Sequence, residues 1–489
     1  MTTIKRYLRP ALCLASLYIV YITAMLAFSS HTSPMWQDAL GWDSAIFSLM
    51  GKGVCEGKTL YADLFDHKGP VIFYINAIGH LAGGRTGIFA VQCVFGAVCI
   101  FLFYKIFLLL REERGYGRLA YGALVFFAVY SYFFFTFERG NLTEEYSLVF
   151  ITVPLYLMLR YAKSAGQNTE HPLKYSFVYG ICFGILAFLR VNNAVTVVSG
   201  VLALIIFLLV KKRYACLLKN ILAGIGGILS VSVPISLVFL SKGAFREMIY
   251  AAFIHNLKYN SHAEAGEIKP EMFWALFAPI ILCGLLFLIS VIKNKSFELC
   301  DGIILAALLS NTLMLCISNQ YPHYFAVFVP VYFVALSRYF TAGLRPLCVF
   351  LITVAAITSV LTVHLYFSRM YESHFVKEET KTLCESVKAQ AENIPPEERD
   401  SVICFQITPY VYHYADIMPA HKYFTLQNSW AKANPEILCE FFSWMEQTPP
   451  TWVVIAEWED TERLFEILDR KYELQSRGGG VRFYRLKEQ

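Results

Sequence analysis

The chain has 489 residues, of which 56% are hydrophobic and 16% are charged, whereas soluble domains carry about a quarter charged residues. Residues 1–367 hold 28 basic against 17 acidic side chains, and residues 368–489 hold 14 against 20, so the net charge of +5 joins a basic region to an acidic one. This composition indicates a membrane protein and disfavours nucleic-acid binding. The 13 cysteines, scattered without a Cys-x-x-Cys pair, disfavour a disulfide framework or a zinc site.

Eleven apolar runs, taken in chain order, are long enough to cross a bilayer as helices. We predict spans at 11–29, 86–110, 118–137, 145–162, 174–190, 193–210, 219–240, 272–292, 301–318, 321–341 and 346–367. The first run has no small-x-small cleavage site, so we interpret it as a retained anchor. Residues 70–84 are apolar but short, and Pro70 favours an interfacial or half-inserted helix that begins there.

The distribution of basic residues predicts the orientation of these spans. If the N-terminus is cytoplasmic and the spans alternate, the basic clusters at 5–9, 111–118 and 211–213 fall on the inner side, where positive charge is favoured. Most acidic residues of the first 367 then fall outside. The same orientation places four stretches on one outer face, namely residues 30–85, 138–145, 241–271 and 319–323.

The tail changes character after residue 367. SVICFQ, WVVIAE and VRFYRL are typical of short strands, and PEILCEFFSWMEQ and TERLFEILDRKY of helices. We therefore predict two domains, a polytopic helical membrane domain (1–367, with juxtamembrane helices in the outer loop 30–85) and a small extracytoplasmic α/β domain (368–489). Four side chains of the tail fit either an acceptor surface or a hydrophobic core, namely Tyr410, Tyr412, His413 and Trp430.

Polar residues gather at four places on the predicted outer face, and Arg190 joins them at an outer helix end. They lie in GWDSAIF (Asp43), DLFDHKGP (Asp63, Asp66, His67 and Lys68), FERGNLTEEY (Glu138, Arg139, Glu144 and Glu145) and NQYPHYF (His323 and Tyr324). Ionisable groups at membrane depth are costly and are usually retained for function. Their occurrence on one side of the predicted bundle therefore favours a functional site.

Each cluster taken alone also has a structural interpretation. Charges just outside a membrane helix are commonly interfacial anchors, and Glu144 with Glu145 fits an ordinary acidic first turn of a helix that Thr143 caps. Asp66 and Lys68 fit a local ion pair, which contributes little if it is exposed. Only the convergence of the four clusters distinguishes a site from these interpretations.

A site with both signs of charge at a membrane surface fits one kind of reaction. A carboxylate removes a proton from a hydroxyl or holds a divalent cation. Lysine and arginine bind a phosphate and stabilise the charge that it gains on leaving. Together these groups suit attack by a hydroxyl on a phosphate-linked carbon while the tail of the phosphate stays in the lipid, which is the chemistry of a lipid-phosphate sugar donor.

With these motifs in this order, the chain resembles the GT-C membrane glycosyltransferases, in the branch of protein O-mannosyltransferases, lipid A aminoarabinose transferase and their bacterial relatives. That branch has an acidic residue after the first span, a Lys-Pro-Pro-type motif ending the first outer loop, and an acidic loop after the third span. GWDSAIF, YADLFDHKGP and GNLTEEY occupy those positions, although Lys68-Gly69-Pro70 replaces Lys-Pro-Pro. The likeness is strongest over residues 38–150 and weak over the tail.

The resemblance implies an inverting hexosyl- or pentosyltransferase of the plasma membrane. Its donor would be a polyprenyl-phosphate monosaccharide, and its acceptor a hydroxyl of a glycan, glycolipid or protein. Asp43 would be the general base, Lys68 would contact the donor phosphate, and Glu144 and Glu145 would position the acceptor or a metal. By chemistry rather than by motif, we add Asp66 to the acceptor or metal group and expect donor phosphate or sugar contacts from His67, Arg139, Arg190, His323 and Tyr324.

Two other kinds of protein compete with this interpretation. A transporter or flippase of lipid-linked sugars predicts midplane charges and paired inverted repeats, whereas the charges here cluster at one face and we find no repeat. An O-antigen ligase or polymerase type enzyme uses diphosphate-linked glycan donors. The sequence leaves open the sugar, the acceptor, the oligomeric state and whether a divalent cation such as Mg or Mn joins Asp43, Glu144 and Glu145.

Overall fold

The computed structural model describes residues 14–19, 26–27, 29–35, 40–110, 116–165, 170–258, 270–317, 321–339 and 378–488. The chain divides into two compact units, each of which is assembled from three segments that are separate in sequence. Unit 1 comprises Met1–Ala27, Gln92–Leu237 and Ala265–Phe367. Unit 2 comprises Phe28–Val91, Val238–Glu264 and Ser368–Gln489.

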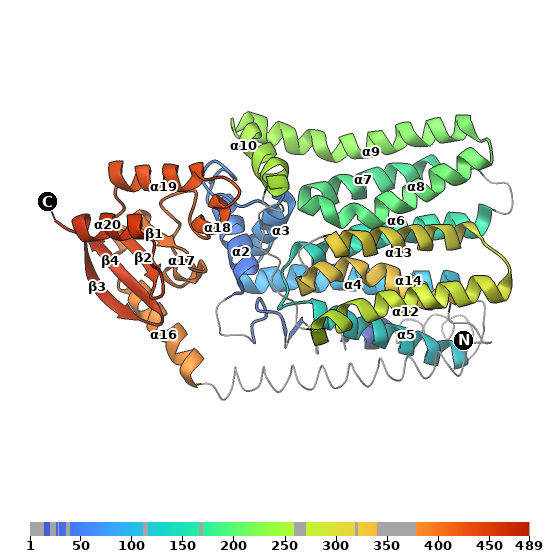
Figure 1. Cartoon of the computed structure of the whole chain (residues 1–489), viewed down its shortest axis with the longest axis horizontal. Coiled ribbons are helices and arrows are strands. Elements are labelled where there is room, and N and C mark those ends of the chain that lie inside the picture. Colours follow the sequence, from blue (N-terminus) through green and yellow to red (C-terminus); the bar gives the residue numbers. More distant parts are fainter. Residues whose placement is uncertain are drawn as a thin grey trace. The chain divides into compact units, whose positions relative to one another are not determined.

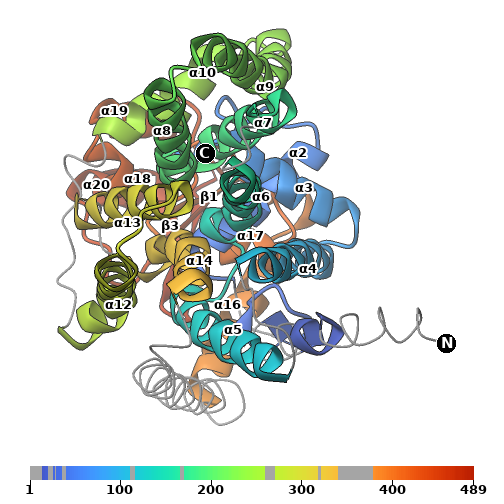
Figure 2. The ribbon, with the colours of Figure 1, turned by 90° about the vertical axis from the view of Figure 1, so that its right-hand side faces the viewer.

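Unit 1 is a bundle of long apolar helices that run side by side (Figure 1) and are seen nearly end-on in Figure 2. Its helices are α4 (Arg85–Leu110), α5 (Tyr116–Thr136), α6 (Thr143–Ser164), α7 (Leu173–Arg190), α8 (Val195–Val210), α9 (Tyr214–Ser241), α12 (Pro270–Asn294), α13 (Leu299–Ile317) and α14 (Val329–Tyr339). Helix α4 begins in unit 2 and α9 ends there. Two short 3-10 helices complete the bundle, η3 (Val191–Ala194) between α7 and α8 and η5 (Pro322–Phe328) before α14.

Among the described residues, five helical stretches are long and apolar enough to cross a membrane, so the chain is a polytopic helical membrane protein. They are Arg85–Leu110, Leu173–Val210, Tyr214–Ser241, Leu276–Lys293 and Leu299–Ile317. The second of these covers two of the predicted spans. The predicted spans at 118–137, 145–162 and 321–341 are largely helical, in α5, α6 and η5 with α14, without being among the five. Most of 11–29 and all of 346–367 lie outside the described residues, so a total of eleven stays a prediction.

Helices α7 and α9 approach each other so closely that only glycine fits at the contact. A Cβ atom added at Gly180 would lie 2.0 Å from the carbonyl oxygen of Gly224, and one at Gly227 would lie 2.1 Å from that of Phe177. Small residues at such a crossing allow backbone-to-backbone packing of membrane helices. Beside this contact, α7, α8 and α9 line an open, largely apolar cavity of about 390 Å³.

The part of unit 2 before the tail consists of short helices, α2 (Trp42–Cys55), α3 (Pro70–Leu81), α10 (Phe245–Ile249) and the π-helix η4 (Tyr250–His255). Helix α3 begins at Pro70, as predicted, because proline fits the first turn, where its missing N–H is not needed. Helices α2 and α3 pack tightly at Gly51, where an added Cβ would lie 2.6 Å from that of Asn76. This contact joins the two segments that carry the first and second polar motifs.

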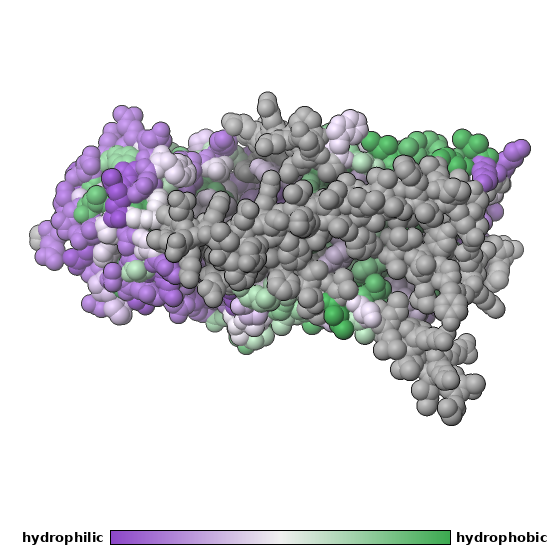
Figure 3. Space-filling model, turned by 90° about the horizontal axis from the view of Figure 1, so that it is seen from below, coloured by the Kyte–Doolittle hydropathy of each residue, from purple (hydrophilic) through white to green (hydrophobic). Residues whose placement is uncertain are grey.

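The tail contributes a four-stranded sheet to unit 2, with the strand order β1-β2-β4-β3. The strands are β1 (Val402–Phe405), β2 (Trp452–Ala456), β3 (Tyr472–Gly478) and β4 (Val481–Leu486); β1 and β2 are parallel, and the other pairs are antiparallel. The helices around it are α16 (Glu378–Glu392), α17 (Tyr410–Ala415), α18 (Gln427–Ala431), α19 (Glu436–Gln447) and α20 (Glu462–Lys471). In Figure 3 the tail is mostly hydrophilic, whereas the helical bundle shows hydrophobic residues on its surface.

All three strands and both helices predicted in the tail are present, and sequence reasoning missed β3. This strand follows α20 without an intervening turn, and its YELQSRG sequence is largely exposed, so it lacks the apolar alternation that marks a strand. Tyr412 and Trp430 are almost completely buried, which places them in the hydrophobic core rather than on an acceptor surface.

Candidate active site

The predicted site residues fall into two groups, one in each unit. The first, which we call the loop cluster, lies in unit 2 and consists of Asp43 in the first turn of α2 and Asp66, His67 and Lys68 just before α3. Asp66 and Lys68 are buried, whereas Asp43 is half-buried. Burial raises the pKa of the Asp66 carboxyl, against the lowering effect of Lys68, and the negative charge of Asp43 raises that pKa further. The two carboxylates and the ammonium group are therefore close enough to interact.

Hydrogen bonds fix the backbone of the loop cluster. The Asp66 carboxylate accepts the backbone N–H of Lys68 at 2.8 Å, and the Tyr61 hydroxyl donates to the Lys68 carbonyl, also at 2.8 Å. The Asn256 amide, which follows η4, donates to the His67 carbonyl at 2.5 Å. The Lys68 ammonium donates to His67 Nε2 at 2.9 Å and lies 5.8 Å from the centre of the Phe47 ring. The loop thus holds a cation and a carboxylate in a defined geometry.

The second group, the helix-end cluster, lies in unit 1 at the outer ends predicted for its helices. It consists of Arg190 at the end of α7, Glu144 at the start of α6, His323 and Tyr324 in η5, and Glu138 and Arg139 in the turn between α5 and α6.

Arg190 and His323 each meet a carboxylate in this cluster. The Arg190 guanidinium forms an ion pair with Glu144 and stacks over the Tyr324 ring, with its central carbon 3.6 Å from the ring centre. His323 Nδ1 donates a hydrogen bond to the Glu138 carboxylate. The Glu144 side chain is 3% exposed and that of Arg190 16%, so this pair is shielded from solvent. Arg139 is exposed.

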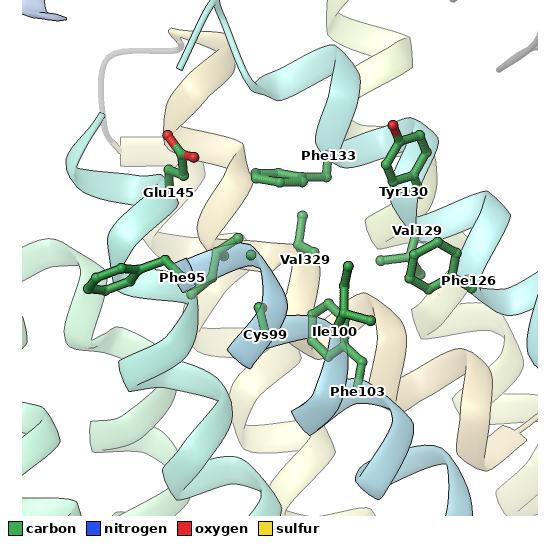
Figure 4. A pocket seen from close by; sticks show the side chains of 12 residues that line it. Phe95, Cys99, Ile100, Phe103, Phe126, Val129, Tyr130, Phe133, Glu145 and Val329 are labelled. Carbon is green, nitrogen blue, oxygen red and sulfur yellow. The ribbon is translucent and has the colours of Figure 1, made fainter. Parts of the chain in front are cut away.

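The adjacent glutamates have different partners. While Glu144 pairs with Arg190, Glu145 accepts hydrogen bonds at both oxygens from the Gln92 amide, at 2.8 and 3.1 Å, and one from the backbone N–H of Asn141 at 2.8 Å. Figure 4 shows the Glu145 carboxylate at one end of a small cavity of about 40 Å³, whose other walls are almost entirely apolar. In this structure Glu145 ties the turn before α6 to α4.

That turn has an unusual backbone. Residues 138–141 all adopt positive φ angles, of 42°, 76°, 76° and 58°. Glycine and, to a lesser degree, asparagine tolerate such angles, so the strain falls on Glu138 and Arg139. Strained backbone of this kind gathers at functional sites, where the surrounding structure enforces it. Thr143 is not the cap of α6 that the sequence suggested. Leu142 occupies the N-cap position, and the Thr143 hydroxyl instead donates to Glu144 at 2.9 Å.

Sequence reasoning missed three residues that hold the candidate site together, Gln92, Tyr61 and Asn256. The role of Gln92 could have been inferred from the sequence, because an unpaired amide inside an apolar run of a membrane helix is energetically costly. Nothing in the sequence indicates the roles of Tyr61 and Asn256, since each donates to a backbone carbonyl, which every residue has. Across the described parts of the chain, no three histidine, cysteine, aspartate or glutamate side chains converge as a metal site, so we derive no step through a metal ion.

Comparison with solved structures identifies the fold. ArnT from Cupriavidus metallidurans bound to undecaprenyl phosphate superimposes with a TM-score of 0.59 at 13% identity, covering 97% of both chains. The TM-score is 0.53 at 12% identity for the archaeal oligosaccharyltransferase AglB from Archaeoglobus fulgidus in complex with an inhibitory peptide and a dolichol-phosphate. This match covers 99% of this chain and 75% of the other. The complex of the A. fulgidus oligosaccharyltransferase with Zn and sulfate gives 0.51 at 12% identity, covering 93% and 69%.

These similarities extend over nearly the whole chain and confirm the GT-C fold that the motifs predicted. At such low identity they establish the fold alone. No protein-family model and no curated protein sequence matches the chain.

Proposed function

We propose that the chain is a glycosyltransferase that moves a sugar from a polyprenyl-phosphate-linked monosaccharide to a hydroxyl acceptor on the outer face of the plasma membrane. The acceptor would be a cell-envelope glycan, a glycolipid or a protein. The main support for the proposal is the loop cluster, in which the buried Asp66 accepts the Lys68 backbone N–H and Asp43 lies in the first turn of α2, within a GT-C fold. Two structures with this fold contain undecaprenyl phosphate or dolichol-phosphate, which supports a lipid-phosphate donor.

In the proposed reaction the acceptor oxygen attacks the anomeric carbon of the sugar, and the bond from that carbon to the phosphate oxygen breaks. The phosphate leaves on its lipid, and the hydroxyl proton passes to Asp43. Because attack comes from the face opposite the phosphate, the anomeric configuration is inverted. Asp43 suits the role of base because it is partly exposed and begins a helix, whereas Asp66 is buried and engaged with the Lys68 backbone.

Lys68 would stabilise the negative charge that develops on the leaving phosphate. Its backbone is held by Tyr61 and Asp66, so the ammonium needs little reorganisation when the donor binds. His67, which shares a hydrogen bond with the ammonium, would assist it. Asp66 would position the acceptor through its effect on the loop.

The helix-end cluster would bind the sugar and the phosphate of the donor. It offers the cationic or protonatable side chains of Arg139, Arg190 and His323 together with the Tyr324 ring. Glu144 would orient Arg190, and Glu145 would hold the strained turn that presents Arg139. Whether transfer needs a divalent cation is tested by chelation of the purified protein.

The experiment is a transfer assay in purified membranes with a panel of radiolabelled polyprenyl-phosphate sugars. Replacing Asp43 with asparagine is expected to lower transfer by a factor of 10² to 10⁴, the usual contribution of a general base. Lys68→Met is expected to lower the affinity for the donor about tenfold to a hundredfold, because a hydrogen bond to a charged group is lost.

Asp63→Asn and Lys58→Met serve as matched controls, because both residues are exposed in the same loop. Wild-type transfer by Asp43→Asn would remove the base assignment, and unchanged donor affinity in Lys68→Met would remove the phosphate contact. Transport of lipid-linked sugar without any transfer product would indicate a flippase. Use of diphosphate-linked donors alone would indicate a ligase or polymerase type enzyme.

A further inference from the structure

Within unit 2, the tail contacts the helix that carries Asp43. His413, in α17, donates a hydrogen bond from Nε2 to the carbonyl oxygen of Ala45 at 2.9 Å. Ala45 lies in the first turn of α2, two residues after Asp43, and its own N–H closes that turn on the Gly41 carbonyl at 2.7 Å. A carbonyl can only accept, so the proton of the imidazole sits on Nε2. Burial lowers the pKa of His413 to about 4, so the ring is neutral at pH 7.

The tail also holds the other end of α2. Asp416, which ends α17 in a left-handed conformation, forms an ion pair with Lys52 at 2.7 Å in the last turn of α2. Nearby, an added Cβ at Gly53 would lie 3.0 Å from the terminal methyl group of Met418. Both ends of the helix are therefore fixed by one short stretch of the tail.

A third contact fixes the loop that precedes α3. The backbone N–H of Phe65, next to Asp66, donates to the carbonyl of Lys422 at 3.0 Å. The Phe65 ring packs edge-on against Tyr423 and Trp430, with ring centres 5.2 Å apart in both pairs. Residues 413–430 thus contact both segments that carry the loop cluster.

From these contacts we propose that residues 413–430 position Asp43 and Lys68, with His413 as the positioning residue for the first turn of α2. This inference rests on the proposed function, because it assigns the tail a role in the same reaction. The N–H groups of a first helical turn lack intrahelical partners and the turn frays easily. An external anchor at the Ala45 carbonyl therefore restricts where the Asp43 carboxylate can lie. A displacement of about 1 Å at a reacting group lowers rates by about a hundredfold.

The test compares two substitutions of similar size in the full chain. His413→Gln keeps an N–H donor at about the position of Nε2, whereas His413→Leu removes it. Glu398→Gln is the control, because the side-chain partners of Glu398 are Arg485 and Trp452, both within the tail. Transfer kinetics and hydrogen–deuterium exchange of residues 42–52 are measured in nanodiscs.

We expect His413→Leu to lower kcat at least tenfold with the donor KM within twofold of wild type, and to speed exchange in residues 42–52. Recovery of kcat to within about threefold in His413→Gln, with an unchanged control, supports positioning. Unchanged kcat and exchange in His413→Leu overturns the inference, and so does an equal loss in both His413 variants and the control. If the wild-type protein shows no transfer, the proposed function is refuted. The hydrogen–deuterium exchange of residues 42–52 then still tests whether His413 stabilises α2.

Discussion

The ion pair between Arg190 and Glu144 gives a prediction that separates stability from function. Replacing Arg190 with methionine leaves the Glu144 carboxylate, only 3% exposed, without its cationic partner. Among the described side chains, only the Thr143 hydroxyl still donates to it. Breaking a buried pair by removing one partner costs about 3 to 5 kcal/mol, because an uncompensated charge stays in a poorly solvated place.

Loss of the stack between Arg190 and Tyr324 adds about 1 kcal/mol to that cost. In the double variant Arg190→Met with Glu144→Gln no charge is left uncompensated, so we expect a free energy of unfolding within about 2 kcal/mol of wild type. Both variants should nevertheless lose donor binding, because neither retains the guanidinium. The double variant is therefore expected to regain stability without regaining donor binding.

The free energy of unfolding is measured on purified protein by titration with a denaturing detergent, and donor binding by the transfer assay. Arg338→Met with Asp301→Asn is the matched control, because Arg338 pairs with the buried Asp301 in the same unit but outside the helix-end cluster. The control should keep wild-type transfer. The reasoning is refuted if Arg190→Met alone is as stable as wild type, or if the double variant is no more stable than the single one.

Two further predictions concern packing and pH. Gly180→Ala should lower the thermal midpoint of unfolding, because its Cβ would lie 2.0 Å from the Gly224 carbonyl oxygen. Gly284→Ala, with open space around it, should be neutral or stabilising. Equal midpoints for the two variants would contradict the close contact of α7 and α9. Burial lowers the pKa of His255 from 6.5 to about 4, so the folded state favours the neutral ring. Its contribution to stability is complete above pH 6.5 and is lost as the pH falls towards 4, by about 2 kcal/mol at pH 5. Detergent titration of wild type and His255→Phe between pH 7 and 5 checks this, and equal slopes would count against it.

The long helices of unit 1 could be predicted from the sequence because their apolar length marks them. The start of α3 was predicted because Pro70 fixes it, and the GT-C fold because three short polar motifs occur in a particular order. The partners of those motifs could not be predicted. Glu144 and Glu145 are identical neighbours in the sequence, yet one meets Arg190 and the other Gln92.

Tertiary packing accounts for the other differences. The positive φ angles of Glu138 and Arg139 have no sequence signal, since neither residue type favours that conformation. Likewise, nothing in the motif around Asp43 indicates that a histidine of the tail contacts its helix. Contacts between residues hundreds of positions apart depend on how the segments meet in space.

The three-segment construction of unit 2 has a consequence for biosynthesis. His413 is made 368 residues after Ala45, which takes about 20 to 70 seconds at ordinary ribosomal speeds. During that time α2 and the loop before α3 have been translated while their partners in the tail do not yet exist. A nascent chain that stalls or is truncated in its last hundred residues therefore leaves an earlier, already inserted region unfinished, and quality-control proteases should recognise that region rather than the missing end.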